Sequence, residues 1–385
     1  MRRRIVIGLV SLVALAVVTM GAWAVAIGPV AVWRVLTNGT TTVWDHLAYP
    51  GGETTPSPIP RPWPTQIIDE PSVTLDGIPR RVSAVLEQHD GLAMVVIHDG
   101  AIAYEWHSPN HDSTTPTMLF SVTKSITSLL VGAAIEDGLI KSVDDPITLY
   151  LPELATGGFE AVTIEEALQM DSNSTYVEDD NPFGTHVEFN YTADLEKDIL
   201  GLAVRDEPHA EFTYKSGDNA ILGLILDRVL EPESITSYLQ RRLLDPLGVE
   251  HPGVWSTDDD DGLERTWCCL ALTAADLARF GQLVLDGGAV DGQQVISPEW
   301  LAVSFTPAYE AERWPADYAG SALTNYGYQW WLTDDAVLAL GKDGQYLYID
   351  PNRDAVVVRT GTSQGGIGWV DLLQEVAEQL PRAGG

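Results

Sequence analysis

The spacing of hydrophobic and polar residues changes period twice along the chain. Two apolar runs joined by Asp99-Gly100 predict a β-hairpin over Ala93–Trp106. Apolar residues at helical spacing then predict helices over Ser121–Asp137, Ala220–Val229 and Ala274–Leu285. Helices are therefore expected to dominate the middle of the chain.

The C-terminal stretch returns to runs that are typical of strands. Since strands are expected at both ends of the folded region, we predict one sheet that joins them, with a helical region inserted between its strands. The C-terminal strands are predicted over Tyr326–Leu332, Val337–Leu340, Tyr346–Asp350 and Ala355–Thr360.

The N-terminus has the pattern of a membrane or export segment. Three arginines, Arg2 to Arg4, precede an apolar run from Ile5 to Trp33. A run of this length is sufficient for one transmembrane helix with a cytoplasmic N-terminus. A cleaved signal peptide is the alternative, because Ala24-Val25-Ala26 resembles a cleavage site. Either interpretation places the rest of the chain outside the cytoplasm; a buried core helix fits the arginines less well.

Proline-rich sequence separates this segment from the folded region. The stretch PGGETTPSPIPRPWP, residues 50–64, favours an extended spacer because proline at this density opposes helix and strand. We therefore predict an anchor or signal segment over 1–34, a linker over 35–66 and one folded domain over 67–380.

The net charge limits the expected partners, and the two cysteines are interpreted separately. The 385 residues include 55 Asp and Glu against 22 Lys and Arg, a net charge of -33, so nucleic acid and anionic lipid headgroups are not expected partners. The adjacent Cys268 and Cys269 are predicted to be free and buried, since neighbouring residues rarely reach relaxed disulfide geometry. Without a Cys/His cluster at ligand spacing, a structural zinc site is not expected. We expect no other metal and no organic cofactor. The sequence does not indicate the oligomeric state.

The first candidate catalytic motif lies where a loop enters the helix at Ser121. In the stretch FSVTK, residues 120–124, a spacing of three places Ser121 and Lys124 on one helical face. The dipole at the first helical turn disfavours a protonated amine, so a buried Lys124 can accept the proton of Ser121. The N–H of Ser121 is a candidate oxyanion donor. The alternative is a capping serine beside an exposed lysine.

Two further motifs are candidates for the same site. In FTYKSGDN, residues 212–219, Tyr214 and Ser216 can face one cleft, and Tyr214 can relay a proton; a half-buried aromatic followed by helix caps is the alternative. In the stretch GKDGQ, residues 341–345, glycines allow close approach of a substrate, and the N–H of Gln345 can complete an oxyanion hole. An ordinary hairpin turn is the alternative there.

The order of these motifs resembles a known signature. An S-x-x-K, then a Tyr-x-Ser about ninety residues later, then a C-terminal Lys-x-Gly match the pattern of β-lactamases and penicillin-binding proteins. The chain is similar to the β-lactamase-related serine hydrolases of the class C and D-alanyl-D-alanine carboxypeptidase type, and most to the branch that contains 6-aminohexanoate-dimer hydrolase. The resemblance covers roughly Pro79–Gly361 and includes SVTKSITSLLVGAAIEDGLIKSVDDPITLYLPEL, TAADLARFGQLVLDGG and GYQWWL.

The resemblance implies an α/β (α+β) fold in which an antiparallel sheet of N- and C-terminal strands carries an inserted helical region. It also implies Ser121 as nucleophile, Lys124 as general base and Tyr214 as proton relay. Ser216 stands where many relatives have Asn. Lys342, Asp343, Gly344 and Gln345 are the further substrate-binding candidates.

The predicted function is hydrolysis of a small-molecule or peptide-like ester or amide through an acyl-enzyme on Ser121. Two departures from the family pattern disfavour β-lactams as substrates. Ser216 in place of Asn removes an amide that holds the substrate in relatives, and Asp343 in place of the Thr of Lys-Thr-Gly would repel the carboxylate that β-lactams carry. The alternative is that Asp343 turns away from the cleft and pairs with Lys342. A catalytically silent domain that binds a peptide or cell-wall fragment is the alternative, since fold alone does not fix function.

Overall fold

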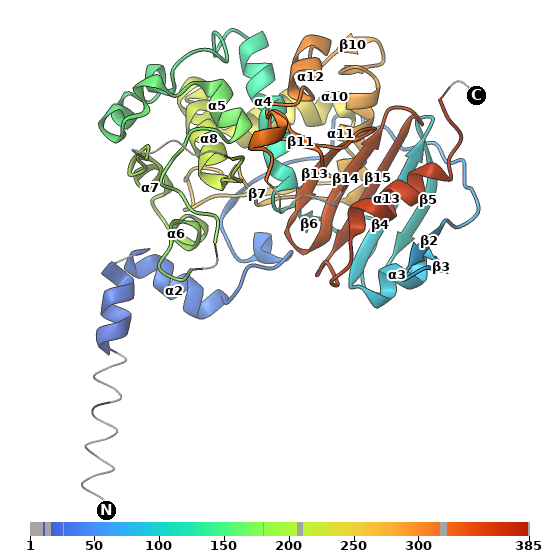
Figure 1. Cartoon of the computed structure of the whole chain (residues 1–385), viewed down its shortest axis with the longest axis horizontal. Helices are drawn as coiled ribbons and strands as arrows, with labels where there is room; N and C mark the ends of the chain where they lie inside the picture. The colour runs from blue at the N-terminus through green and yellow to red at the C-terminus, as the bar shows by residue number, and fades with distance from the viewer. Residues whose placement is uncertain are drawn as a thin grey trace, which may run out of the picture.

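A seven-stranded antiparallel sheet forms the centre of the protein. The computed structural model describes residues 11, 17–25, 27–179, 181–205, 211–315 and 322–383. Figure 1 shows strands from the two ends of the chain side by side in the sheet, with β4 next to β15. The strand order is β11(Asn325–Tyr326), β12(Trp331–Leu332), β13(Val337–Gly341), β14(Gln345–Asp350), β15(Ala355–Gly361), β4(Gly91–His98) and β5(Ala101–His107).

Both faces of this sheet are buried. Along β4, Val95 and Ile97 belong to the core on one face, whereas Met94 and Val96 belong to the core on the other. Burial of each such side chain contributes about 1.5–3 kcal/mol, so both faces need a covering layer. Helix α11(Ala274–Leu285) covers the first face, and α3(Val82–Gln88) and α13(Trp369–Glu378) cover the second.

A helical region is inserted between β5 and β11, and its central helix is α4. Nearly every residue of α4(Val122–Glu136) is buried, because this helix is packed between α8(Ser216–Leu230) and the sheet. The other helices of the region are α5(Ile164–Gln169), α6(Thr185–Tyr191), α7(Leu195–Leu200), α8(Ser216–Leu230), α9(Ile235–Leu239), α10(Asp245–Leu247) and α12(Pro298–Ser304).

A smaller antiparallel sheet fixes the loop that leads into α4. Its strands, in order, are β1(Gly51–Glu53), β7(Val254–Ser256), β8(Leu270–Leu272) and β6(Thr117–Met118). The Leu119 N–H extends the ladder by donating to the Leu270 carbonyl at 2.8 Å. Two hairpins complete the strands, β2(Ser72–Leu75) with β3(Ile78–Arg81) and β9(Ala289–Val290) with β10(Gln293–Gln294).

The predicted α/β architecture, with an antiparallel sheet from both ends and an inserted helical region, is confirmed. The predicted strand over Tyr326–Leu332 is instead the pair β11 and β12, since Gln329 adopts a left-handed φ of 66° and reverses the chain. Residues Lys342–Gly344 form the turn between β13 and β14, and β14 begins at Gln345.

The proline-rich segment is extended, as its composition predicts, but it is attached to the domain along its length. Strand β1 pairs with β7, Ser57 N–H donates to the Val249 carbonyl, and the Pro64 carbonyl accepts from Ile102 N–H. The segment is therefore part of the folded unit and not the free spacer that we predicted, and the folded unit begins before residue 67.

The single transmembrane helix predicted over Ile5–Trp33 is not supported. In the described part of the chain, no one helix is long and apolar enough to cross a membrane; the segments Val17–Val25 and Pro29–Asn38 reach that length only together, with a bend of 117° between them. The bend lies at Gly28, with a φ of 85°, followed by Pro29. Helix α2(Pro29–Asn38) lies against α6, and much of the predicted run is outside the described residues.

Candidate active site

Ser121 lies at a strained entry to α4. Phe120 immediately before it has a φ of 47°, a left-handed conformation that a bulky residue rarely adopts. The next two N–H groups, those of Val122 and Thr123, donate to the carbonyls of Leu119 and Phe120. This tight turn presents the Ser121 side chain at the N-terminus of the helix, and such strain is typical of functional positions.

Ser121 and Lys124 are in direct contact. The Lys124 Nζ donates to the Ser121 Oγ at 2.7 Å and to the Trp267 carbonyl at 3.0 Å. Lys124 is only 1% exposed. The structure thus brings together the two residues that the S-x-x-K spacing predicted to meet, and the backbone of Trp267 sets the position of the amine.

Burial makes Lys124 a weaker cation than an ordinary lysine. Desolvation lowers the pKa of Lys124 to about 8, although the nearby Glu178 carboxylate acts in the opposite direction. At pH 7 about one amine in ten is then neutral, whereas for an ordinary lysine that fraction is below one in a thousand. A neutral amine beside the Ser121 Oγ can accept its proton.

Tyr214 forms the other wall beside the lysine. Its ring centroid is 4.8 Å from the Lys124 Nζ. The ring is stacked on Trp331 at 5.4 Å and meets Tyr326 edge-on at 6.1 Å. The three predicted catalytic residues therefore gather at one place, and aromatic residues of β11 and β12 hold the tyrosine ring there.

The end of β13 lies directly against Ser121, and only glycine fits there. A Cβ added to Gly341 would be 2.4 Å from the Leu119 carbonyl oxygen and 3.3 Å from the Ser121 amide nitrogen. Lys342 follows and is exposed, with its Nζ 3.0 Å from the Thr41 Oγ1. The Gly-Lys junction is thus the part of the third motif that adjoins the nucleophile.

The rest of that motif lies elsewhere in the turn. Asp343 has a φ of 59° at the turn tip, and burial raises the pKa of its carboxyl. Gly344, with a φ of 84°, packs against the Arg359 guanidinium. Gln345 is fully buried, and its Nε2 donates to the Gly361 carbonyl at 2.6 Å. Among the described residues that line the pocket at Ser121, Lys342 is present, but Asp343, Gly344 and Gln345 are not.

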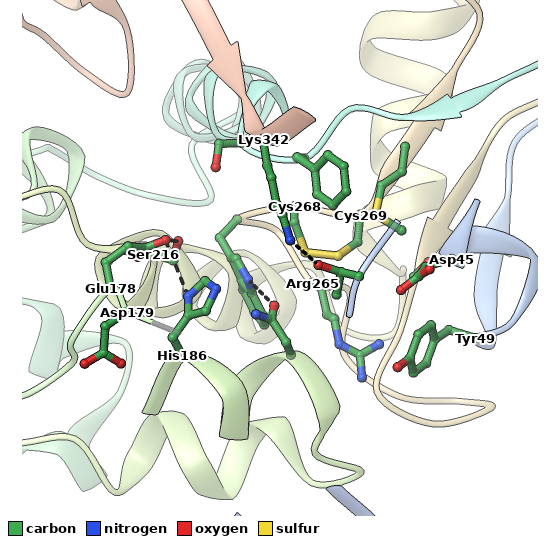
Figure 2. A pocket seen from close by; sticks show the side chains of 17 residues that line it. Asp45, Tyr49, Glu178, Asp179, His186, Ser216, Arg265, Cys268, Cys269 and Lys342 are labelled. Carbon is green, nitrogen blue, oxygen red and sulfur yellow. Dashed lines mark hydrogen bonds and ion pairs between the residues drawn. A yellow bond between two sulfur atoms is a disulfide. The ribbon is translucent and has the colours of Figure 1, made fainter. Parts of the chain in front are cut away.

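The Ser121 hydroxyl opens into a cavity of about 340 Å³. Figure 2 shows its walls, with Glu178, Asp179, His186 and Ser216 on one side, Asp45 and Tyr49 on the other, and Lys342 between them. The described residues contain no group of three side chains with metal-ligand spacing. The cavity is of a size that takes a small organic substrate.

A hydrogen-bonded cluster at one end of this cavity was not predicted. The Glu178 carboxylate accepts from the Ser216 N–H at 2.7 Å and from the Ser216 Oγ at 2.8 Å, and it lies 3.4 Å from the His186 Nδ1. His186 Nδ1 is in turn 2.8 Å from the Tyr176 hydroxyl. Ser216 therefore lines the pocket, as expected, with its hydroxyl engaged by an acid. Glu178 lies in a polar loop without a motif, so its local sequence held no signal for this role.

The two adjacent cysteines form a disulfide, contrary to the prediction that they are free. Cys269 has a left-handed φ of 74°, which reverses the chain and brings the two sulfurs together. Both cysteines line the pocket, directly after Trp267, whose carbonyl binds Lys124. Their predicted burial is observed, with exposed fractions of 6% and 8%.

Comparison with known proteins decides the family. The family model described as Beta-lactamase matches residues 78–373. The chain belongs to the β-lactamase family. Over 314 aligned residues it is 28% identical to 6-aminohexanoate-dimer hydrolase of Paenarthrobacter ureafaciens. The alignment covers 75% of this chain and 78% of the relative. The prediction of a serine hydrolase is thereby confirmed at the level of the family.

Solved structures share the fold of this β-lactamase-family chain. A Bacillus anthracis protein provisionally named as a 6-aminohexanoate-dimer hydrolase superposes with a TM-score of 0.76 at 21% identity, over 88% of this chain and 95% of the other. A family VIII carboxylesterase superposes with a TM-score of 0.60 at 15% identity, over 78% and 95%. At these identities the likeness extends to the fold.

Proposed function

We propose that the protein hydrolyses an ester or amide through an acyl-enzyme on Ser121, with Lys124 as general base. The observation that supports this most is the 2.7 Å contact between the Lys124 Nζ and the Ser121 Oγ, in a buried place where the pKa of Lys124 is lowered to about 8. A serine hydroxyl is a poor nucleophile unless an adjacent base removes its proton.

The reaction has two stages. Neutral Lys124 takes the Ser121 proton while Oγ bonds to the substrate carbonyl carbon. Collapse of the tetrahedral intermediate breaks the bond to the leaving group, which receives the proton by way of Tyr214. A water molecule then attacks the acyl-enzyme, the same groups move its proton back to Ser121, and the acid is released.

The developing oxyanion needs two N–H donors. The Ser121 N–H at the start of α4 is one candidate, as the sequence indicated. We propose the N–H of Lys342 as the second, because Lys342 lines the pocket and follows Gly341, which adjoins the Ser121 nitrogen. This replaces the Gln345 N–H of the sequence prediction, since Gln345 lies in β14 opposite Gly341.

The charge of the pocket favours some substrates over others. Glu178 and Asp179 both line it, and the chain has a net charge of -33. We propose neutral esters, or amides that carry an amino group, as better substrates than β-lactams, which bring a carboxylate. An amide-hydrolysing relative, 6-aminohexanoate-dimer hydrolase, supports this choice of bond.

Turnover of a neutral ester tests the proposal. Ser121→Ala and Lys124→Ala should each abolish hydrolysis of p-nitrophenyl butyrate to a similar degree, because the two residues act as one unit and their effects do not add. Circular dichroism should show both variants folded. A folded Lys124→Ala protein with near wild-type turnover would favour another base, and no turnover by wild type would favour the silent binding domain.

We also propose that the domain acts outside the cytoplasm, held or exported by its N-terminal segment. Arg2 to Arg4 before the apolar run, and the 67% exposed Trp33 on α2, support this location. Disulfides persist in oxidising compartments, and Cys268 and Cys269 form one. Two measurements distinguish an anchor from a cleaved signal. One is the identity of the N-terminal residue of the mature protein, and the other is whether carbonate extracts the protein from membranes.

A further inference from the structure

The end of the cavity opposite Glu178 has its own set of polar groups. Asp45, Ser256 and Arg265 line it, and Figure 2 shows Asp45 beside Tyr49 and near Arg265, across the cavity from Glu178 and Asp179. These residues come from two segments, 41–49 before the domain core and 256–269 after α10. None of them belongs to the three catalytic motifs.

Each of the three lining residues has a buried polar atom without a hydrogen-bond partner among the residues that the structure describes. These atoms are Asp45 Oδ2, Ser256 Oγ and Arg265 Nε, and the residues are 8%, 1% and 2% exposed. Buried polar atoms are nearly always paired, because an unpaired one costs about 1–3 kcal/mol. Three such atoms at one end of a substrate cavity indicate that a bound group supplies their partners.

The neighbouring contacts hold these atoms in place. Asp45 Oδ1 accepts from the Thr42 N–H at 3.0 Å and from the Thr42 Oγ1 at 2.7 Å, which leaves Oδ2 as the available acceptor. The Arg265 guanidinium donates to the carbonyls of Thr257 and Thr192 and lies 5.1 Å from the Tyr49 ring centroid. Burial lowers the pKa of Arg265 to about 10, so the guanidinium remains charged at neutral pH.

We propose that this end of the cavity binds a neutral substrate group that both donates and accepts hydrogen bonds, namely an amide. An amide C=O can accept from Arg265 Nε and Ser256 Oγ, while its N–H donates to Asp45 Oδ2. A carboxylate in the same place would face Asp45, and an ammonium would face Arg265, so a charged group meets repulsion from one of the two. The inference rests on the proposed hydrolysis at Ser121 and adds a second recognition element beside it.

Esters that differ only in the terminal group remote from the ester bond test the proposed amide site directly. p-Nitrophenyl esters with two to six methylenes and a terminal carboxamide, carboxylate or methyl group would be compared, with a second series that carries the same ends on the alcohol of acetate esters. In at least one series, the ester with the terminal carboxamide should have a kcat/KM about tenfold higher than the esters with a carboxylate or a methyl group. Such a difference is expected when the polar groups of a site are left without partners by the other two esters. Equal rates for all three ends in both series would overturn the inference.

Asp45→Asn gives an outcome that unfolding cannot imitate. If the amide oxygen keeps the Thr42 contacts, the NH₂ replaces Oδ2, so an acceptor becomes a donor and the negative charge of Asp45 is removed from this end of the cavity. The preference should then reverse from carboxamide to carboxylate. Asp179→Asn, at the other end of the cavity, is the matched control and should keep the carboxamide preference. An unchanged preference in Asp45→Asn would contradict the proposal.

The methyl-ended ester separates this inference from the proposed function. Wild-type hydrolysis of that ester, lost in Ser121→Ala, reports on the catalytic residues alone. If no ester is turned over, binding of hexanamide and hexanoate to the Ser121→Ala protein, followed by ligand-observed NMR, still applies the test. Hexanamide should bind more tightly than hexanoate, with the order reversed in the Asp45→Asn background; no difference between them would reject the site.

Discussion

The Glu178 carboxylate holds Ser216 with both of its oxygens, one on the backbone N–H at 2.7 Å and one on the hydroxyl at 2.8 Å. The same carboxylate favours the protonated form of Lys124. An acid with no place in the predicted motifs therefore influences the general base. Its removal should change how activity depends on pH.

Glu178→Gln should move the alkaline rise in kcat/KM to lower pH. Activity depends on neutral Lys124, whose fraction increases as pH rises through its pKa of about 8. Since Glu178 raises that pKa, loss of its charge should lower it and bring the rise earlier. The pH profile for p-nitrophenyl butyrate measures the shift, with Asp179→Asn as the control. A rise that moves to higher pH, or moves equally in the control, would contradict the coupling.

Gly341→Ala should impair catalysis more than stability. The added Cβ would lie 2.4 Å from the Leu119 carbonyl oxygen, so either β13 or the Ser121 turn must shift. A displacement of about 1 Å in a catalytic group can cost 10²-fold in rate. Gly368→Ala is the matched control, since among the described residues its Cβ would meet only Asp371 Oδ2, at 3.5 Å. Equal kcat in the two variants would show that the approach of β13 to Ser121 is unimportant.

Tyr214→Phe should affect amides more than activated esters. p-Nitrophenolate leaves without a proton, whereas an amine leaving group must be protonated, and general acid catalysis contributes about 10²–10⁴-fold. The loss of kcat for an anilide should exceed the loss for p-nitrophenyl butyrate by at least about tenfold. The Phe ring keeps the stack on Trp331, so folding should be preserved. Equal losses for both substrates would remove Tyr214 from the role of proton relay.

How far the sequence could predict the site depends on the range of the interactions. Ser121 and Lys124 meet because they are three residues apart on one helix, and this spacing is visible in the sequence. Glu178 reaches Ser216 across 38 residues through the fold of a polar loop, which has no periodicity to indicate it. The hairpin Ala93–Trp106 and the helix Ala274–Leu285 were likewise predictable from local patterns.

Where prediction failed, backbone conformation was the cause. A left-handed residue at Gln329 divides the predicted strand Tyr326–Leu332, and another at Cys269 allows the disulfide that neighbouring cysteines rarely form. Asp343 was expected to face the substrate because the Lys-x-Gly motif aligned it with a binding residue. It lies instead at the tip of a turn and is not among the described residues that line the pocket, so its charge does not exclude β-lactams from this pocket. Glu178 and Asp179 line the pocket, and their carboxylates are the groups that would repel the carboxylate of a β-lactam.

The central claim is that Lys124 activates Ser121 as a nucleophile, and fluorophosphonate labelling tests it without knowledge of the substrate. Mass spectrometry of the wild-type protein should locate the adduct on Ser121, with a labelling rate that rises with pH through about 8. Folded Lys124→Met protein should label slower by at least about 10²-fold, the range typical of general base catalysis. Labelling of another residue, or equal rates in the two proteins, would contradict the account.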